Sequence, residues 1–353
     1  MEGILMKPID KVTIYDIAEA TNLSIATISR VINKKGRYSA ATEERVLKAM
    51  EELGYSPSAS AQSLASNQTH TLGLMLPFWN KRQLGDDFTM QFLNGATVAA
   101  TELKYDILLD NRSLLSELSV EQLIKRKRVD GIIFSSVGYS YQNLLNDLIK
   151  AHFPTVYTGM KLPFDIQGNN IYGFHEIYKR DFLEECYKKG YRKIAMFTSF
   201  FQDQELHMIE NTRQVIENFR TEKGLPEDNC RLIVYDYYSP THFEYLLSEL
   251  LTETPHVQAI YMDQMFTCSR AYNIINSFGM KIPEDIAVVS TAQYERAGEE
   301  FSPGLTTTYV HAYEMGMAAV RLLVDRIQGT SSSVEQQIPY SFLYRESFRP
   351  YEQ

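Results

Sequence analysis

The chain has 353 residues and a formal net charge of −9. This length is too great for one compact core and suits a small module joined to a two-lobed body. The apolar stretches are shorter than the ~20 residues that cross a bilayer, and the N-terminal apolar piece is too short for a signal peptide, so we expect a cytoplasmic protein without a membrane segment. Three widely spaced cysteines without a C-x-x-C pair predict no disulfide framework, metal site or cofactor.

Charge is distributed unevenly along the chain. Up to Ser66, eight basic residues balance eight acidic ones, so the whole acidic excess lies beyond this point. Between Arg30 and Lys48, six basic residues face two acidic ones. An acidic body with one basic patch is typical of a protein that touches phosphates at one end.

The residues after Thr13 predict two short helices joined by a turn. Ile14, Ile17, Ala18 and Thr21 have amphipathic spacing, and Thr13 and Asp16 are spaced as a capping box. Asn22 and Leu23 break the pattern, after which Ser24 can cap a second helix over 25–32. Such a short connection forces the helices to cross steeply, as in a helix-turn-helix.

A third helix is predicted after Ser39. It would bury Val46, Met50 and Leu53, and Gly54 is placed to end it. Periodicity alone leaves open a small three-helix domain of any purpose.

The residues themselves carry a resemblance. TIYDIAEATNLSIATISRVIN, over 13–33, resembles the DNA-reading segment of the LacI/GalR (lactose-repressor) family. The continuation ends in the family's Y-x-P-x-x-x-A-x-x-L hinge signature as Tyr55, Pro57, Ala61 and Leu64. Further family signatures recur as GYRKI (190–194), IPEDIAVVS (282–290), PGLTT (303–307) and RES (345–347).

The exposed face of the second helix is expected to read bases in the major groove through Ile25, Ala26, Ser29 and Arg30. Arg30 can contact guanine in bidentate fashion, although a phosphate clamp is the alternative, whereas Ile25 and Ala26 can read thymine methyls or shape. The resemblance places backbone-phosphate contacts on a further set of residues: Thr13, Tyr15, Ser24, Asn33, Arg37, Tyr38 and Ser39.

The segment from Ala59 to Ser66 is too short to be a stable helix alone. The resemblance implies that it orders on DNA, pairs with its dimer mate in the minor groove, and wedges Leu64 between the central base pairs. An ordinary linker leucine is the alternative for Leu64. Tyr55, Ser58 and Ala61 complete the expected DNA-binding set, and Ser58 departs from the polar amide often found after the hinge proline.

Beyond Thr69, short β-branched or apolar runs alternate with amphipathic stretches, which predicts parallel sheets with helices on both faces. We expect strands at 71–77, 105–110, 130–136, 154–158, 193–199, 232–236, 259–263 and 286–290, and helices at 90–103, 141–151, 181–189 and 266–278. The expected fold class is an all-α helix-turn-helix domain followed by a two-lobed α/β body like a periplasmic binding protein.

The predicted domains are a DNA-binding domain at 1–57, a hinge at 58–68, and an effector-binding and dimerisation body at 69–353. Within this body, the first lobe covers about 69–168 and 311–331. The second lobe covers about 169–310 and 332–353.

In typical family members the cleft between the lobes binds a small effector, usually a sugar or purine. The expected cleft residues here are Phe78, Trp79, Phe88, Ser135, Gly159, Thr212, Arg213, Asp263, Ala292 and Gln293. The aromatic residues suit a flat ligand, or could simply be core.

Several hydroxyl-binding groups of the family are replaced together. Met262 precedes Asp263 where the family has asparagine, and Ala292 and Gln293 stand where it has two aspartates. Because each unpaired buried hydroxyl costs ~1–3 kcal/mol, the pocket is altered, for a different ligand or for none. Arg213 could enter the cleft if its loop shifts by one residue, which would favour an anion such as a sugar phosphate. Asp263 would then serve structurally.

The resemblance predicts a transcription regulator, with a repressor of a carbohydrate-type operon as the leading hypothesis. Its partners would be a pseudo-palindromic operator in double-stranded DNA, a second copy of the chain, and a possible small-molecule effector. The tail lacks a leucine heptad, so we expect a dimer rather than a tetramer. An enzyme or a solute-binding protein on the same body is the rival class, but no catalytic or phosphate-cradling motif is present.

Overall fold

The computed structural model describes residues 12–32, 36–55, 68–76, 87–110, 117–135, 142–159, 170–173, 175–200, 206–253, 256–330 and 335–350. It contains two compact units. One comprises Met1–Thr71 together with Glu121–Asp130, and the other comprises Leu72–Val120 together with Gly131–Gln353.

Three helices form the head, which we define as described residues 12–55: α1 (Ile14–Thr21), α2 (Ile25–Ile32) and α3 (Ala40–Leu53). Their ends follow the predicted caps. Ser24 and Ser39 accept hydrogen bonds from the backbone N–H groups of Thr27 and Thr42, each at 3.2 Å, and Gly54 ends α3 with a φ of +65°.

Five buried side chains form the core of the head: Ile17, Ile28, Val31, Val46 and Ala49. Met50 packs against this core from its edge. The prediction that Leu53 is buried was wrong, because Leu53 is 39% exposed at the end of α3 and Ala49 takes the inward position.

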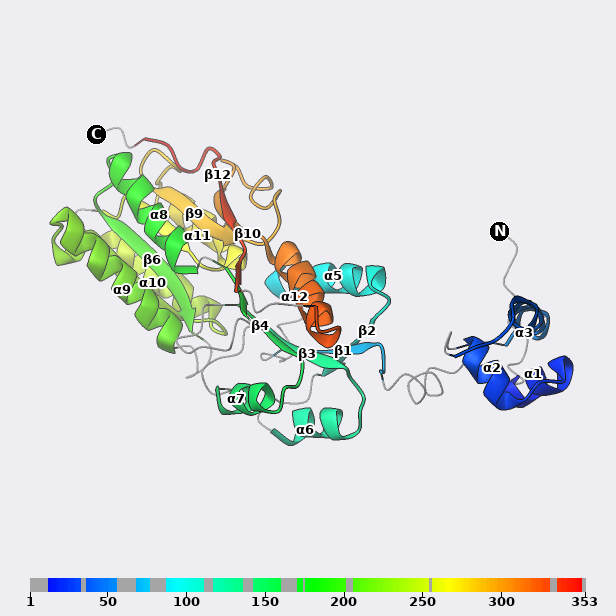
Figure 1. Ribbon diagram of the computed structural model, residues 1–353. Helices are drawn as coiled ribbons and strands as arrows, with labels where there is room; N and C mark the ends of the chain where they lie inside the picture. Colours follow the sequence, from blue (N-terminus) through cyan, green and yellow to red (C-terminus); the bar gives the residue numbers. More distant parts are fainter. Residues whose placement is uncertain are drawn as a thin grey trace, which may run out of the picture. The chain divides into compact units, whose positions relative to one another are not determined.

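The first lobe is built on a six-stranded sheet of order β11-β5-β4-β3-β1-β2. Its strands are β1 (Thr71–Met75), β2 (Asp106–Asp110), β3 (Gly131–Ser135), β4 (Thr155–Gly159), β5 (Asn170–Tyr172) and β11 (Gln336–Gln337). Its helices are α5 (Asp87–Glu102), α6 (Glu117–Lys125), α7 (Gln142–Lys150) and α12 (Ala312–Ile327). Helix α12 packs against α5 (Figure 1), and the close approach requires glycine: a Cβ at Gly95 would lie 1.9 Å from the Tyr313 carbonyl oxygen.

The second lobe has a six-stranded sheet of order β12-β10-β9-β8-β6-β7. Its strands are β6 (Ile194–Phe200), β7 (Cys230–Asp236), β8 (Ala259–Met262), β9 (Ala287–Ala292), β10 (Thr306–Val310) and β12 (Tyr340–Leu343). Its helices are α8 (His175–Lys188), α9 (Leu206–Lys223), α10 (Pro240–Thr252) and α11 (Cys268–Ser277), with 3-10 turns η4 (Glu227–Asn229) and η5 (Met265–Thr267). The pairings described in this sheet are parallel except for β10 with β12.

This architecture is the fold class predicted from the sequence, a helical head followed by two α/β lobes. The eight predicted strands are present with small shifts at their ends, whereas helix α8 starts six residues before the predicted 181. Four of the described strands lie outside the eight predicted ones: β5 and β11 pair with each other in the first sheet, and β10 and β12 pair in the second. The chain passes to the second lobe after 172 and after 337.

Candidate DNA-binding surface and effector residues

The exposed side of the head carries the residues predicted to touch DNA. Tyr15 is 70% exposed, and Ile25 and Ala26 are exposed at the start of α2. Apolar side chains that stay exposed to water do not contribute to the stability of so small a domain. Contact with bases would bury them. Ser29 is half-buried on the same helix.

Arg30 is exposed near the end of α2. Its aliphatic stem runs beside Gly36, where an added methyl group would lie 3.5 Å from Cδ of Arg30. Gly36 has a φ of +82°, a conformation that favours glycine. Gly36 therefore lies close to the arginine side chain, and Arg37 follows as a second exposed cation.

The polar residues at the helix starts are occupied in capping. The backbone N–H and the hydroxyl of Thr13 both donate to the Asp16 carboxylate at 2.7 Å, and these bonds hold the pKa of Asp16 below its usual value. The Ser24 and Ser39 hydroxyls each lie 2.8 Å from a threonine hydroxyl of the same turn. These contacts fix the side chains at helix N-termini, where backbone N–H groups favour anions.

Tyr38 and Tyr55 pack against the core of the head rather than extending from it. Burial raises the pKa of the Tyr55 phenol. Four of the predicted DNA-binding residues lie outside the described residues: Asn33, Ser58, Ala61 and Leu64.

The expected effector residues of the first lobe lie at the carboxyl ends of its strands, where α/β sheets bind ligands. Ser135 ends β3 and is buried. Gly159 ends β4 with a φ of +132°, so a side chain there would be strained. Phe88 on α5 stacks on Phe92 and packs against buried residues of both lobes. Phe78 and Trp79 lie outside the described residues.

In the second lobe, Asp263 follows β8 and is held by neighbouring strands. It accepts hydrogen bonds from the Ser199 N–H at 2.7 Å, the Ser199 hydroxyl at 3.0 Å and the Tyr235 hydroxyl at 3.1 Å. Burial raises the pKa of the Asp263 carboxyl, although the Ser199 N–H opposes the rise. These contacts tie the end of β8 to β6 and β7, whereas the structural role considered for Asp263 in the sequence was conditional on Arg213 entering the cleft.

Thr212 and Arg213 lie next to each other on α9 but point to different surroundings. Thr212 is buried, and the Lys179 ammonium donates to its hydroxyl at 2.6 Å. Arg213 is half-exposed and pairs with Glu210 one turn earlier on the helix, at 3.3 Å. The hypothesis that Arg213 enters the cleft is therefore not supported by this geometry, and the cation beside Thr212 comes from α8.

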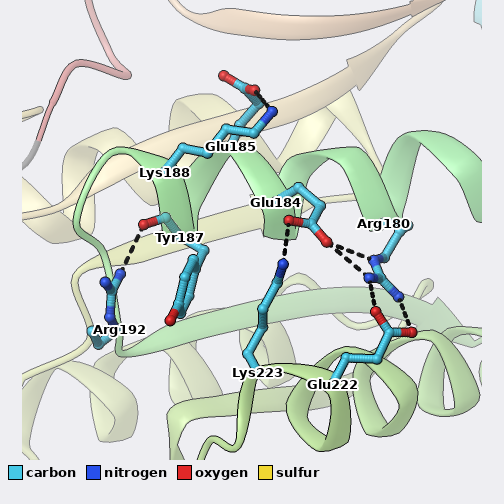
Figure 2. A network of polar contacts seen from close by, with 8 residues as sticks. All are labelled: Arg180, Glu184, Glu185, Tyr187, Lys188, Arg192, Glu222 and Lys223. Carbon is cyan, nitrogen blue, oxygen red and sulfur yellow. Dashed lines mark hydrogen bonds and ion pairs between the residues drawn. The ribbon is translucent and has the colours of Figure 1, made fainter.

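Lys179 is only 5% exposed and its position depends on how α8 is held against α9. Figure 2 shows the outer clamp between these helices: Arg180 pairs with Glu184 and Glu222, and Lys223 with Glu184 at 2.9 Å. Burial raises the pKa of Glu184, but hydrogen bonds from Arg180 and Lys223 leave it below its usual value.

A second polar group lies on the interior of the same lobe. The Tyr261 hydroxyl lies 2.6 Å from the Thr291 hydroxyl and 2.8 Å from the Thr308 hydroxyl. Tyr178 stacks on Tyr261, and burial raises its pKa well above the ordinary value. Ala292 is fully buried at the end of β9, and Gln293 after it is half-buried.

Three residues that the sequence did not mark as part of the site are Lys179, Ser199 and Tyr235. Lys179 contacts a residue 33 positions away, and Ser199 and Tyr235 reach a carboxylate 64 and 28 positions away. No local spacing signals such contacts. The parallel strand order alone would have placed Ser199 beside Asp263, because β6 and β8 are neighbours.

None of the helices in the described part of the chain combines the length and apolar character that a membrane crossing needs. Within the same residues, no group of three or more His, Cys, Asp or Glu side chains could hold a metal ion. Cys186, Cys230 and Cys268 are buried free thiols, and burial raises the pKa of Cys230 to about 11.

Comparison with known proteins agrees with this arrangement. Residues 13–58 match the family of bacterial regulatory proteins of the lacI type, and residues 183–348 match the periplasmic binding protein-like domain. This chain is a LacI-family transcription regulator. It is therefore a DNA-binding protein and not an enzyme, and its relatives extend over almost the whole chain.

Catabolite control protein A of Priestia megaterium is 28% identical over 348 residues, covering 95% of this regulator and 99% of the relative. The ribose operon repressor of Halalkalibacterium halodurans is 24% identical, covering 95% and 96%. Among solved structures, the lac repressor dimer bound to operator and the anti-inducer ONPF has a TM-score of 0.79 at 22% identity, covering 95% and 98%. The complex of transcriptional regulator CelR with cellobiose has a TM-score of 0.66 at 25% identity, covering 96% and 100%.

Proposed function

We propose that this regulator binds a pseudo-palindromic operator as a homodimer and represses a carbohydrate-type operon. The single observation that carries the DNA-reading part is the exposed face of α2, where Ile25, Ala26 and Arg30 face outward from a closed core. Two such heads related by a two-fold axis read two half-sites. Its place in the cell is then the cytoplasm, on the nucleoid.

The residues have separate roles in this proposal. Ile25, Ala26, Ser29 and Arg30 read base edges, and Leu64 wedges the minor groove. The phosphate-binding set is Thr13, Tyr15, Ser24, Asn33, Arg37, Tyr38 and Ser39, with Tyr55, Ser58 and Ala61 completing the approach to the hinge. The domain division at 57 and 68 belongs to the same proposal.

Arg30→Ala and Leu64→Ala test these roles because they should fail differently. Arg30→Ala should relax base preference at one position per half-site, at a discrimination cost of about 1–3 kcal/mol. Leu64→Ala should weaken binding by reducing the central kink. Gel-shift and bending assays on the selected operator measure both effects. Wild-type affinity and wild-type bending in both variants would contradict the docking.

The effector site is altered relative to the family in this proposal. Asp263, Thr212 and Thr291 already hold hydrogen bonds within the second lobe, and the Gly159 backbone disfavours a side chain. A hydroxylated ligand would find few unoccupied partners, so it would gain little differential affinity between the free and DNA-bound conformations.

Neutral monosaccharides and purines should therefore leave both the thermal stability and the operator affinity of this regulator unchanged. Thermal-shift screening against neutral sugars, sugar phosphates and nucleobases measures the first, and operator release measures the second. A stabilisation of several degrees by a neutral sugar, together with release from operator, would contradict the altered site. Relatives bind cellobiose in one solved complex, so cellobiose belongs in the panel.

A further inference from the structure

Four consecutive basic residues, Lys125–Arg128, lie at the C-terminal end of α6, and all four are exposed. We call them the basic turn. They stand in the part of the chain beyond Ser66, where acidic residues are in excess. One or two cations stabilise a helix C-terminus, but four in succession repel one another, which an anionic partner would relieve.

The backbone of the basic turn is held rigidly. The N–H groups of Arg126, Lys127 and Arg128 donate to carbonyl oxygens of α6 at 2.9–3.0 Å. Leu123 before the turn and Val129 after it are both buried. The four side chains therefore project outward from a fixed support.

The arginines of the basic turn differ from Lys125 in their ion pairs. Lys125 pairs with Glu121, 2.5 Å away on the same helix. Arg126 and Arg128 form no ion pair with any of the residues that the structure describes. The basic run at 188–193 differs, because Lys188 pairs with Glu185 and Arg192 stacks on Tyr187 (Figure 2).

Asp130 ties the basic turn to the residues that follow the hinge. Its carboxylate accepts hydrogen bonds from the Thr69 N–H at 2.6 Å, the Thr69 hydroxyl at 2.9 Å and the His70 N–H at 2.7 Å. The Asp130 N–H donates to the Thr71 carbonyl at 2.8 Å. The segment Glu121–Asp130 accordingly belongs to the same compact unit as the chain up to Thr71.

Chain length then limits how far the basic turn can lie from the hinge. Leu64 and Thr69 are five residues apart, which span at most ~18 Å, and Arg128 and Asp130 are two apart, at most ~7 Å. With about 5 Å more across the Thr69–Asp130 hydrogen bonds, and with Leu64 in the minor groove, Arg128 therefore lies within about nine base pairs of the operator centre at 3.4 Å per pair. A rigid cationic turn so placed faces a dense array of phosphates.

We propose that the Lys125–Arg128 turn is a second DNA-binding site, which binds backbone phosphates beside the hinge. The proposal rests on the proposed function, since it requires the hinge to lie on DNA. The site adds affinity without reading bases, so it acts equally on operator and unrelated DNA. DNA binding then involves residues beyond the hinge as well as the N-terminal residues that the sequence predicts.

The test is the double variant Arg126→Gln/Arg128→Gln in the full-length regulator. In the proposed homodimer the variant removes two contacts from each protomer, four in all, which lowers the slope of log K against log salt by ~3.6, at ~0.9 per phosphate. The wild-type advantage in affinity then shrinks about 150-fold between 50 and 200 mM salt. Phosphate-ethylation interference should weaken at a subset of phosphates within about nine base pairs of the operator centre, while the contacts of the head remain.

Lys188→Gln/Lys281→Gln is the matched control, because it removes the same charge from exposed lysines of the second lobe. It should leave the slope unchanged. If the Arg126/Arg128 variant kept the wild-type salt slope and affinity for DNA, the proposal would be overturned. This is also the result expected if the basic turn bound an acidic protein instead of DNA. If wild-type protein itself showed no salt-dependent binding to any selected sequence, the proposed function would fail instead.

Discussion

The head and the second lobe use polar residues in opposite ways. In the head, Arg30 and Arg37 are exposed, and the hydroxyls of Ser24 and Ser39 make hydrogen bonds within their own helical turns. In the second lobe, Asp263 and Thr212 are satisfied by side chains from other elements. Polar groups left at a surface remain available to a partner, whereas polar groups paired inside a lobe stabilise that lobe. The head can thus bind a partner through its exposed polar groups, whereas the polar groups of the second lobe stabilise the fold of that lobe.

The largest expected effect tests the small core of the head. Ile28→Ala removes one of five fully or nearly buried apolar side chains and should cost about 2–5 kcal/mol, enough to unfold so small a domain. Hydrogen exchange in the full-length protein should then show loss of protection in α1–α3 only, with loss of DNA binding.

Ile25→Ala, on the same helix, is the control for this variant. Because Ile25 is exposed, its removal should leave protection of the head unchanged while weakening operator binding. Equal effects of the two variants on protection would contradict the assignment of an inner and an outer face to α2.

A smaller effect tests whether the second lobe is stabilised by its internal polar contacts. Thr212→Val removes one acceptor of the buried Lys179 ammonium and should lower the free energy of unfolding by about 1–3 kcal/mol. Operator affinity should be unchanged, because the contact lies outside the DNA-reading surface. Chemical denaturation and gel shift measure the two quantities.

Thr221→Val provides the matched change on the same helix. Its hydroxyl donates to the Glu217 carbonyl at an exposed position, so its loss should alter stability by less than about 0.5 kcal/mol. If Thr212→Val were equally mild while neutral sugars stabilised the protein, Thr212 would belong to a ligand site rather than to the lobe's own support.

What the sequence could predict follows the same division. The caps at Thr13, Ser24, Ser39 and Gly54 are local, and they fix the three helices of the head to the residue. The contact of Lys179 with Thr212 depends on how two helices pack, which no local pattern contains. Of the four strands that were missed, β5 and β11 have only two or three residues, which carry too little periodicity. The basic turn, by contrast, was visible as four consecutive cations in the printed sequence.

Selection of bound sequences from a random DNA pool tests the central claim most directly, if wild type and Arg30→Ala are selected in parallel. The account predicts that wild type recovers a pseudo-palindrome with two equivalent half-sites, and that Arg30→Ala recovers the same site with preference lost at one position in each half. Recovery of no common sequence by the wild type, or of an identical preference by both proteins, would contradict it.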